Sequence, residues 1–248
     1  MFSIPTPCRP VNDRPTCLAW HPPIGPFVTQ AETGRKRGAA GKNSIVMVAS
    51  PPRLGAAVHF GHSPGVRSPA MLFSPLTIRG PLVIELEKLE DDRGFFARSF
   101  CSDLFMERGL CTHYPQWSIS FNHHRGTLRG LHFQAAPYEE IKLVRCTRGA
   151  IFDVVVDLRP GSPTRAKWVG IELTADNRAS LYIPAGFAHG FQTLTNDAEV
   201  VYHISEPYRQ EAARGVRWND PDLAIVWPNA TQRVISERDR ALPTLHDL

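Results

Sequence analysis

Short segments in which apolar and polar side chains largely alternate fill most of the sequence after Leu76, and they limit the possible folds more than any other feature. Residues 83–89, 151–158 and 199–205 are the clearest examples. Such alternation is typical of half-buried β-strands, because successive side chains along a strand point to opposite faces of the sheet. Ordered structure is therefore expected from about Leu76, as a mainly β fold built as an antiparallel sandwich or barrel.

One short helix and one tight turn interrupt the predicted strands. Residues 102–109 have helical character, with Ser102 expected as the N-cap and Gly109 beyond the C-terminal end. Residues 91–94 are Asp-Asp-Arg-Gly, which predicts a turn before the aromatic pair at positions 95 and 96. The fold is thus expected to contain few helices, all of them short.

Residues 1–70 differ in composition from the remainder of the chain. They hold 11 of the 22 prolines and eight Lys or Arg against two Asp or Glu, a formal charge of +6, whereas residues 71–248 carry 20 and 22, a charge of −2. Without an amphipathic period, residues 1–70 are not expected to bury enough apolar surface to offset their ordering entropy. We predict that they are disordered, or precede the true initiation site near Met71, and that residues 71–248 form one domain.

Charge, hydropathy and cysteine content argue against several classes of protein. The weak negative charge of residues 71–248 gives no indication of nucleic-acid binding. The sequence contains no secretory signal and no apolar run long enough to span a membrane. The five cysteines are odd in number and form no C-x-x-C pair, which is typical of a reduced, cytoplasmic protein rather than a disulfide framework or a zinc site.

Residues 126–134, Gly-Thr-Leu-Arg-Gly-Leu-His-Phe-Gln, combine a cation, an imidazole and two glycines within one predicted strand. His132 shares a strand face with Gly130, whereas Arg129 lies on the opposite face of an ideal strand. If both side chains act in one site, a bulge or strand end near Gly130 must redirect one of them, which is a usual role of glycine in strands.

A second histidine, His189, follows a tight turn within residues 183–190. Together with His132 it resembles the two-part signature of the cupin superfamily of small β-barrels. Metal-binding cupins carry H-x-H followed by a glutamate in the first part, whereas this chain has His-Phe-Gln, and its nearby glutamates are Glu139 and Glu140. Two histidines and an unassigned glutamate make a poor metal site, so the sequence favours acid–base chemistry by the histidines.

Two distant residues are candidate partners of these histidines. Tyr202 shares an apolar strand face with Val200 and Ile204, so it is expected to point inward. Asp239 has two interpretations. With Ser236 it matches a helix-capping pattern, but its carboxylate is also suited to orienting His132, as an aspartate does in hydrolase triads.

Together these features resemble the nucleotide-sugar 3,5-epimerases typified by dTDP-4-dehydrorhamnose 3,5-epimerase, over about residues 82–245. This resemblance implies a cupin-type jelly-roll barrel, a homodimer, a nucleotide-sugar substrate, and no metal or organic cofactor. The residues that carry it are 92–96, 126–134, Lys142, 153–159, 162–163, 184–191, Tyr202, Tyr208, 218–221, 227–228 and 236–239.

The resemblance also implies roles for individual residues. His132 corresponds to the catalytic base, Tyr202 to the catalytic acid, and Asp239 to the partner of the histidine. The residues that correspond to substrate-binding positions are Arg93, Gln116, Ser118, Arg129, Lys142, His189, Tyr208 and Arg238. Among these, Arg93 and Arg238 match positions that meet the diphosphate.

The expected reaction is epimerisation at C3 and C5 of a nucleoside-diphosphate 4-keto-6-deoxyhexose. The ketone at C4 acidifies the hydrogens at both carbons, and imidazole is a suitable base near neutral pH. The alternatives are inversion of one carbon only, use of another nucleotide, a non-catalytic sugar-binding cupin, and a metal-dependent cupin. A different nucleotide is considered because the family usually has glutamate at the positions of Arg98 and Ala213.

Overall fold

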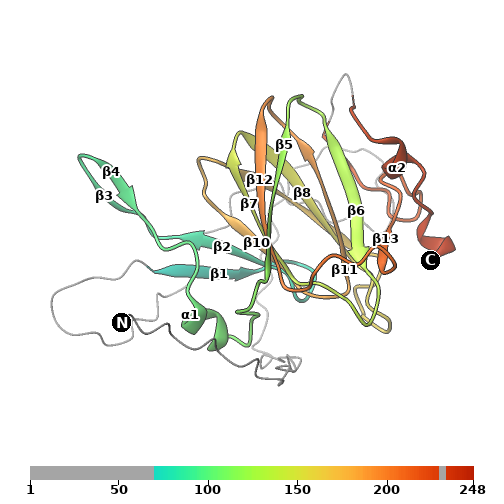
Figure 1. Ribbon diagram of the computed structural model, residues 1–248, viewed down its shortest axis with the longest axis horizontal. Helices are drawn as coiled ribbons and strands as arrows, with labels where there is room; N and C mark the ends of the chain where they lie inside the picture. Colours follow the sequence, from blue (N-terminus) through green and yellow to red (C-terminus); the bar gives the residue numbers. More distant parts are fainter. Residues whose placement is uncertain (1–69, 229–232) are drawn as a thin grey trace, which may run out of the picture.

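The computed structural model describes residues 70–228 and 233–248, which form two antiparallel sheets packed face to face and a separate hairpin (Figure 1). The six-stranded sheet contains, in spatial order, β1 (Met71–Pro75), β2 (Leu82–Leu86), β10 (Ser180–Ile183), β7 (Lys142–Arg148), β12 (Ala198–Ile204) and β5 (Gln116–Asn122). The five-stranded sheet contains β13 (Ala213–Gly215), β6 (Leu128–Gln134), β11 (Phe187–Thr193), β8 (Ala150–Asp157) and β9 (Trp168–Thr174). The predicted mainly β, antiparallel sandwich is confirmed.

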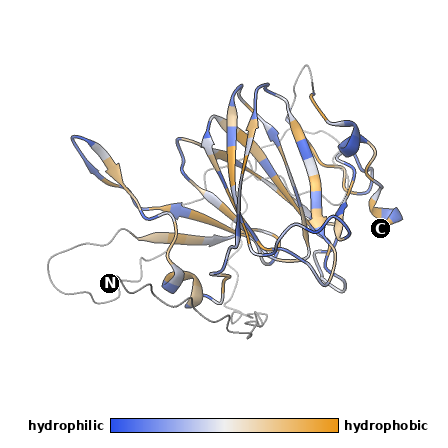
Figure 2. Ribbon diagram, viewed as in Figure 1, coloured by the Kyte–Doolittle hydropathy of each residue, from blue (hydrophilic) through white to orange (hydrophobic). Residues whose placement is uncertain are grey.

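Apolar side chains on the facing surfaces of the two sheets form the central core, and Figure 2 shows hydrophobic and hydrophilic residues alternating along several strands. Val155 of β8 and Phe191 of β11 are almost fully buried there. β8 is buried on both faces, because Phe152 and Val154 on its other side contact a second apolar layer. As a result Asp153, which lies on the core side of β8, is completely buried.

The chain after β13 supplies this second layer and covers the outer face of the five-stranded sheet. Trp168 of β9 donates its indole N–H to the carbonyl of Leu223 at 2.9 Å, which fastens the segment to the sheet. The N–H of Leu128 donates to the carbonyl of Val234 at 2.8 Å and brings α2 (Glu237–Arg240) beside β6. The segment ends in the 3-10 helix η1 (Leu245–Asp247).

A third apolar layer lies on the outer face of the six-stranded sheet, under α1 (Ser102–Met106). Phe105 of α1 is fully buried against β1, β2 and β10. The predicted N-cap is wrong by one residue, because the cap is Cys101 and Ser102 is already helical. Gly109 lies beyond the helix end with φ of 65°, as predicted.

Ordered structure begins before Leu76, contrary to the prediction. β1 pairs with β2 along its whole length, and the N–H of Glu87 donates to the carbonyl of Ala70 at 3.0 Å. The residues of β1 do not alternate in polarity, so the pattern did not reveal the strand. Burial of its apolar side chains holds β1 in the sheet instead. Met71 is 7% exposed, and Phe73 packs on Phe105 with ring centroids 5.4 Å apart.

The predicted turn before the two phenylalanines is confirmed as a hairpin of β3 (Leu89–Asp91) and β4 (Gly94–Phe96). The hairpin projects from the sandwich (Figure 1), and Phe96 is 66% exposed. No described helix combines the length and the hydropathy that a membrane span requires. The prediction of disorder for residues 1–70 concerns a segment that lies, except for Ala70, outside the described residues.

Candidate active site

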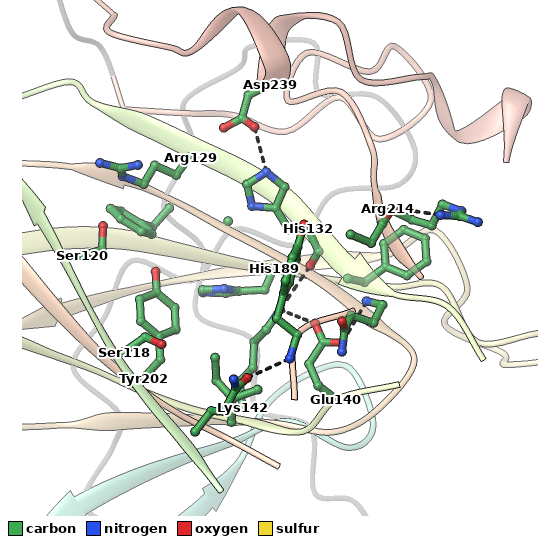
Figure 3. Close-up of a pocket in the computed structure, with 18 of the residues that line it drawn as sticks. Ser118, Ser120, Arg129, His132, Glu140, Lys142, His189, Tyr202, Arg214 and Asp239 are labelled. Atoms are coloured by element: carbon green, nitrogen blue, oxygen red, sulfur yellow. Dashed lines mark hydrogen bonds and ion pairs between the residues drawn. The ribbon is translucent and has the colours of Figure 1, made fainter. Parts of the chain in front are cut away.

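A pocket of about 460 Å³ lies between the two sheets (Figure 3). Its walls come from β5, β7 and β12 of one sheet, from β6, β11 and β13 of the other, and from α2. Ten of the eleven residues predicted for the site line it: Gln116, Ser118, Arg129, His132, Lys142, His189, Tyr202, Tyr208, Arg238 and Asp239. The fold therefore gathers residues that are far apart in the sequence into one cavity.

His132 projects from β6 and is hydrogen-bonded to Asp239 of α2. Its Nε2 lies 2.8 Å from Oδ1 of Asp239, and Oδ2 accepts the Gly130 N–H at 3.1 Å. Burial alone raises the pKa of the Asp239 carboxyl, but the hydrogen bond and charge of His132, the Gly130 N–H and the charge of Arg238 together lower it below the ordinary value of 3.8. The ionised carboxylate can only accept hydrogen bonds, so Nε2 of His132 carries the proton and Nδ1 is the free ring nitrogen.

Asp239 makes the contacts that both interpretations require, the helix cap and the partner of His132. Its backbone N–H donates to the Ser236 hydroxyl at 3.1 Å, which caps α2, while its carboxylate binds His132. The cap fixes the start of the helix, and through it the position of a carboxylate that is only 5% exposed. The partner of His132 is therefore itself held by hydrogen bonds to Ser236 and Gly130.

Gly130 redirects β6 between Arg129 and His132, as the sequence predicts. His132 pairs with His189 and Arg129 pairs with Phe191, so three residue steps on β6 oppose two steps on β11. This bulge leaves both Arg129 and His132 lining the pocket. Gly130 permits it by adopting φ of 116°, a conformation that is unfavourable for other residues.

Arg129 is held by Asn122, a residue that the sequence analysis did not single out. Nε of Arg129 donates to Oδ1 of Asn122 at 2.7 Å. Asn122 is 2% exposed, and its amide nitrogen donates to the carbonyls of Ser120 and Ala198, each at 3.1 Å. This amide fixes the guanidinium through Nε and leaves its two terminal nitrogens available to an anionic or carbonyl-bearing ligand.

His189 and Tyr202 form the inner wall of the pocket. Nε2 of His189 lies 2.5 Å from Oδ1 of the buried Asp153, and the rings of His189 and Tyr202 meet edge to face with centroids 5.9 Å apart. Burial, and then the charge of Asp153, raise the pKa of Tyr202 well above its usual value of 10, against a smaller opposing effect of Arg129. Tyr202 therefore points inward, as predicted, and keeps its proton at neutral pH.

Lys142 is a further cation of the pocket, and its Nζ forms an ion pair with Glu140 at 2.7 Å. Of the two pocket histidines, His132 binds Asp239 and His189 binds Asp153. Glu139 is exposed. Within residues 70–228 and 233–248, no three His, Cys, Asp or Glu side chains converge as ligands of a metal ion would.

Arg93 is the predicted site residue that the single chain does not bring to the pocket. It occupies the turn between β3 and β4, where its side chain is 89% exposed and pairs with Asp91 at 2.5 Å. Figure 1 shows this hairpin on the far side of the sandwich from α2, which carries Arg238 and Asp239.

The structure adds pocket residues that sequence reasoning missed, among them Ser120, Glu140, Glu206 and Arg214, with Asn122 and Asp153 behind them. Strand parity could have found Ser120, because it shares a face of β5 with Gln116 and Ser118. No signal in the sequence distinguished Glu140 from Glu139.

Known proteins share this fold and much of this sequence. A family model described as dTDP-4-dehydrorhamnose 3,5-epimerase matches residues 75–247. A protein of that name from Sinorhizobium fredii is 45% identical over 184 residues, which cover 74% of this chain and 94% of the relative.

Two solved structures extend the likeness. The dTDP-4-dehydrorhamnose 3,5-epimerase from Bacillus anthracis, with TDP and PPi bound, superimposes with a TM-score of 0.68 at 41% identity and covers 71% of this chain and 100% of that one. A 3'-monoepimerase from Streptomyces bikiniensis in complex with dTDP-quinovose has a TM-score of 0.66 at 36% identity, covering 70% of this chain and 87% of that one. The sandwich is therefore a cupin-type jelly roll, as predicted, and the chain belongs to the dTDP-4-dehydrorhamnose 3,5-epimerase family.

Proposed function

We propose that the protein epimerises a nucleoside-diphosphate 4-keto-6-deoxyhexose at C3 and C5, converting dTDP-4-dehydro-6-deoxyglucose into dTDP-4-dehydrorhamnose without a cofactor. The observation that carries this proposal is the placement of two groups in one pocket. His132 comes from the five-stranded sheet and Tyr202 from the six-stranded sheet, so a sugar between the sheets has one of them on each side (Figure 3). Inversion requires this arrangement, because the proton leaves one face of the ring and returns to the other.

Each side chain has a defined task in this mechanism. Nδ1 of His132 takes the proton from C3 or C5, and the electrons of the broken C–H bond move toward the C4 carbonyl to form an enolate. Asp239 stabilises the imidazolium that results, and the Lys142 ammonium stabilises the enolate oxygen. Tyr202 then gives its hydroxyl proton to the opposite face of the same carbon, and exchange with solvent restores the protonation of both residues.

The test is incubation of the purified protein with dTDP-4-dehydro-6-deoxyglucose, with the product's ring stereochemistry assigned by NMR. We expect inverted configuration at both C3 and C5. Inversion at C3 alone would support the alternative that the similarity to the 3'-monoepimerase raises, a single-carbon epimerase. An unchanged sugar would contradict the proposed function.

The active assembly in this proposal is a homodimer that forms along β5. The strand alternates between two environments, because Gln116, Ser118 and Ser120 line the pocket while Trp117 and Ile119 face outward. These two apolar side chains are 72% and 69% exposed, on an edge strand of the six-stranded sheet. Such a contiguous apolar stripe on an edge strand is typical of an interface.

Size-exclusion chromatography with light scattering tests the dimer. Ile119→Glu places a charge in the stripe and should yield monomers, whereas Met106→Glu, at a position on α1 that is 65% exposed, should leave the dimer intact. A wild-type protein that is monomeric at micromolar concentration would contradict this part of the proposal.

A dimer also accounts for Arg93, whose position in the family meets the diphosphate. The hairpin that carries it projects from the sandwich on the side away from α2, which lines the pocket, and Phe95 and Phe96 on the hairpin are exposed. A two-stranded hairpin is at best marginally stable without support. We therefore assign Arg93 to the pocket of the partner subunit.

A further inference from the structure

Glu140 is a carboxylate of the pocket to which the proposed mechanism gives no role. Its side chain is 7% exposed and forms the 2.7 Å ion pair with Lys142 (Figure 3). A buried carboxylate is costly unless its charge is paired and both oxygens are hydrogen-bonded. The role of Glu140 is therefore inferred from the groups that bind its two carboxylate oxygens.

Both oxygens of Glu140 accept hydrogen bonds from groups that only donate. Oε1 accepts from the Lys142 ammonium, and Oε2 accepts the backbone N–H of Gln134 at 2.9 Å. Gln134 is itself held, because its amide nitrogen donates to the carbonyl of Tyr138 at 2.9 Å and its amide oxygen accepts the Arg209 N–H at 2.6 Å. The carboxylate is thus anchored to the end of β6, the strand that carries His132.

Lys142 has three N–H donors at the end of a flexible chain. One donates to Glu140 and a second to the backbone carbonyl of His132 at 3.4 Å. Two acceptors on the protein therefore fix Nζ before a substrate arrives, and they leave the third N–H for a ligand. A donor that is already in place contributes more to transition-state stabilisation than one that must be ordered during the reaction.

We propose that Glu140 is a positioning residue, which aims the third N–H of Lys142 at the oxygen on C4 of the sugar. This inference rests on the proposed function, because it requires a substrate whose C4 oxygen becomes an enolate. Glutamine cannot replace Glu140, because its side-chain amide nitrogen is a hydrogen-bond donor. That nitrogen would face another donor, either the Gln134 N–H or the Lys142 ammonium.

The first experiment compares Glu140→Gln with Glu139→Gln, the same change at the exposed neighbouring position. For Glu140→Gln we expect kcat to fall by about 10- to 100-fold, the scale of effect that misplacing a catalytic group produces. Its KM should stay within about threefold of wild type, since the lost interaction acts mainly in the transition state. Glu139→Gln should match the wild type in both constants.

A double-mutant cycle separates positioning from a purely structural role. If Glu140 acts only through Lys142, then Glu140→Gln added to Lys142→Met should change kcat by less than about twofold. The double variant carries neither buried charge, so it remains an informative comparison even if Glu140→Gln alone does not fold.

Two outcomes would overturn the inference while leaving the proposed function intact: near-wild-type kcat for Glu140→Gln, or an equal loss from Glu140→Gln with and without Lys142. If the wild type and Glu139→Gln also fail to epimerise the sugar, the proposed function falls, and this inference falls with it.

Discussion

At the scale of single residues, Asp239 binds Ser236 through its backbone N–H and His132 through its carboxylate, so we expect it to affect both stability and catalysis. Its folded-state pKa is below the ordinary value of 3.8, mainly because the contacts with His132 and Gly130 outweigh the effect of burial. A carboxylate with a lowered pKa stabilises the fold at every pH above its unfolded value, and this contribution is lost as pH falls through the folded value. Asp239 is therefore expected to contribute to stability at neutral pH and to contribute nothing in strong acid.

Asp239→Asn should lower the free energy of unfolding at pH 7 by about 1–3 kcal/mol, because an amide cannot accept both buried hydrogen bonds. The difference from wild type should persist at pH 5. It should shrink as pH falls from the unfolded-state pKa of about 3.8 through the lower folded-state pKa, because the wild-type carboxylate loses its charge over that range. Urea denaturation of both proteins at a series of pH values measures this difference in the free energy of unfolding. Asp222→Asn, at an exposed position, is the control. A constant difference at all pH values would contradict the assigned cause.

The sequence predicted residues with strong local signals and missed those defined by contacts across the fold. Strand parity predicted the inward orientation of Tyr202, and the glycine in β6 predicted the bulge that brings Arg129 and His132 together. Asn122 could not be predicted, because its role depends on a hydrogen bond to Arg129 on a strand of the other sheet. Glu140 could not be distinguished from its neighbour for the same reason.

At the scale of elements, the close approach of β6 and β11 shapes the pocket. A Cβ on Gly130 would lie 2.6 Å from Cα of Gly190, and a Cβ on Gly190 would lie 2.6 Å from the carbonyl oxygen of Arg129. Real Cβ atoms do not approach backbone atoms so closely, so the two strands would have to separate. Such a separation would move His132 and His189 relative to each other, since they pair across these strands.

Gly130→Ala should therefore lower Tm and abolish most of the epimerase activity. Gly161→Ala is the matched control, because Gly161 also has a positive φ, of 72°, but a Cβ there meets nothing within 4 Å. It should cost only the backbone strain of about 1–2 kcal/mol and leave kcat unchanged. Equal losses of Tm and of activity for the two variants would show that the strand contact does not matter.

At the scale of the whole molecule, β1 is the first strand of the described residues, and we predict that the folded domain begins there. Removal of residues 1–68 should leave Tm and turnover nearly unchanged, because the paired strand and the contacts of Ala70 with Glu87 remain. Removal of residues 1–75 should lower Tm markedly, because it deletes β1 and exposes Phe105. Thermal unfolding of both truncated chains tests this. A large loss of Tm in the first would show that the N-terminal segment stabilises the domain.

The proposed exchange of Arg93 between subunits makes a prediction for mixed dimers. Arg93→Ala and His132→Ala should each impair both sites of their own homodimer. A heterodimer of the two has one pocket with an intact His132 and an intact Arg93 from the partner subunit. Mixing the inactive variants under exchange conditions should therefore restore activity, up to about half a wild-type dimer's turnover per heterodimer if the sites are independent. No recovery, despite heterodimers detected by mass spectrometry, would place Arg93 in its own chain's pocket or outside the site.

The central claim is that His132 and Tyr202 act as base and acid on opposite faces of one sugar ring. The most direct measurement follows deuterium from heavy water into C3 and C5 of dTDP-4-dehydro-6-deoxyglucose by NMR, together with the configuration at each carbon. His132→Ala should lose both exchange and inversion, by roughly 100- to 10,000-fold as is typical of acid–base groups. Tyr202→Phe keeps the base, so deuterium should still enter with retained configuration while inversion falls. If Tyr202→Phe instead inverts both carbons at a near-wild-type rate, Tyr202 is not the acid and the account of the site is wrong.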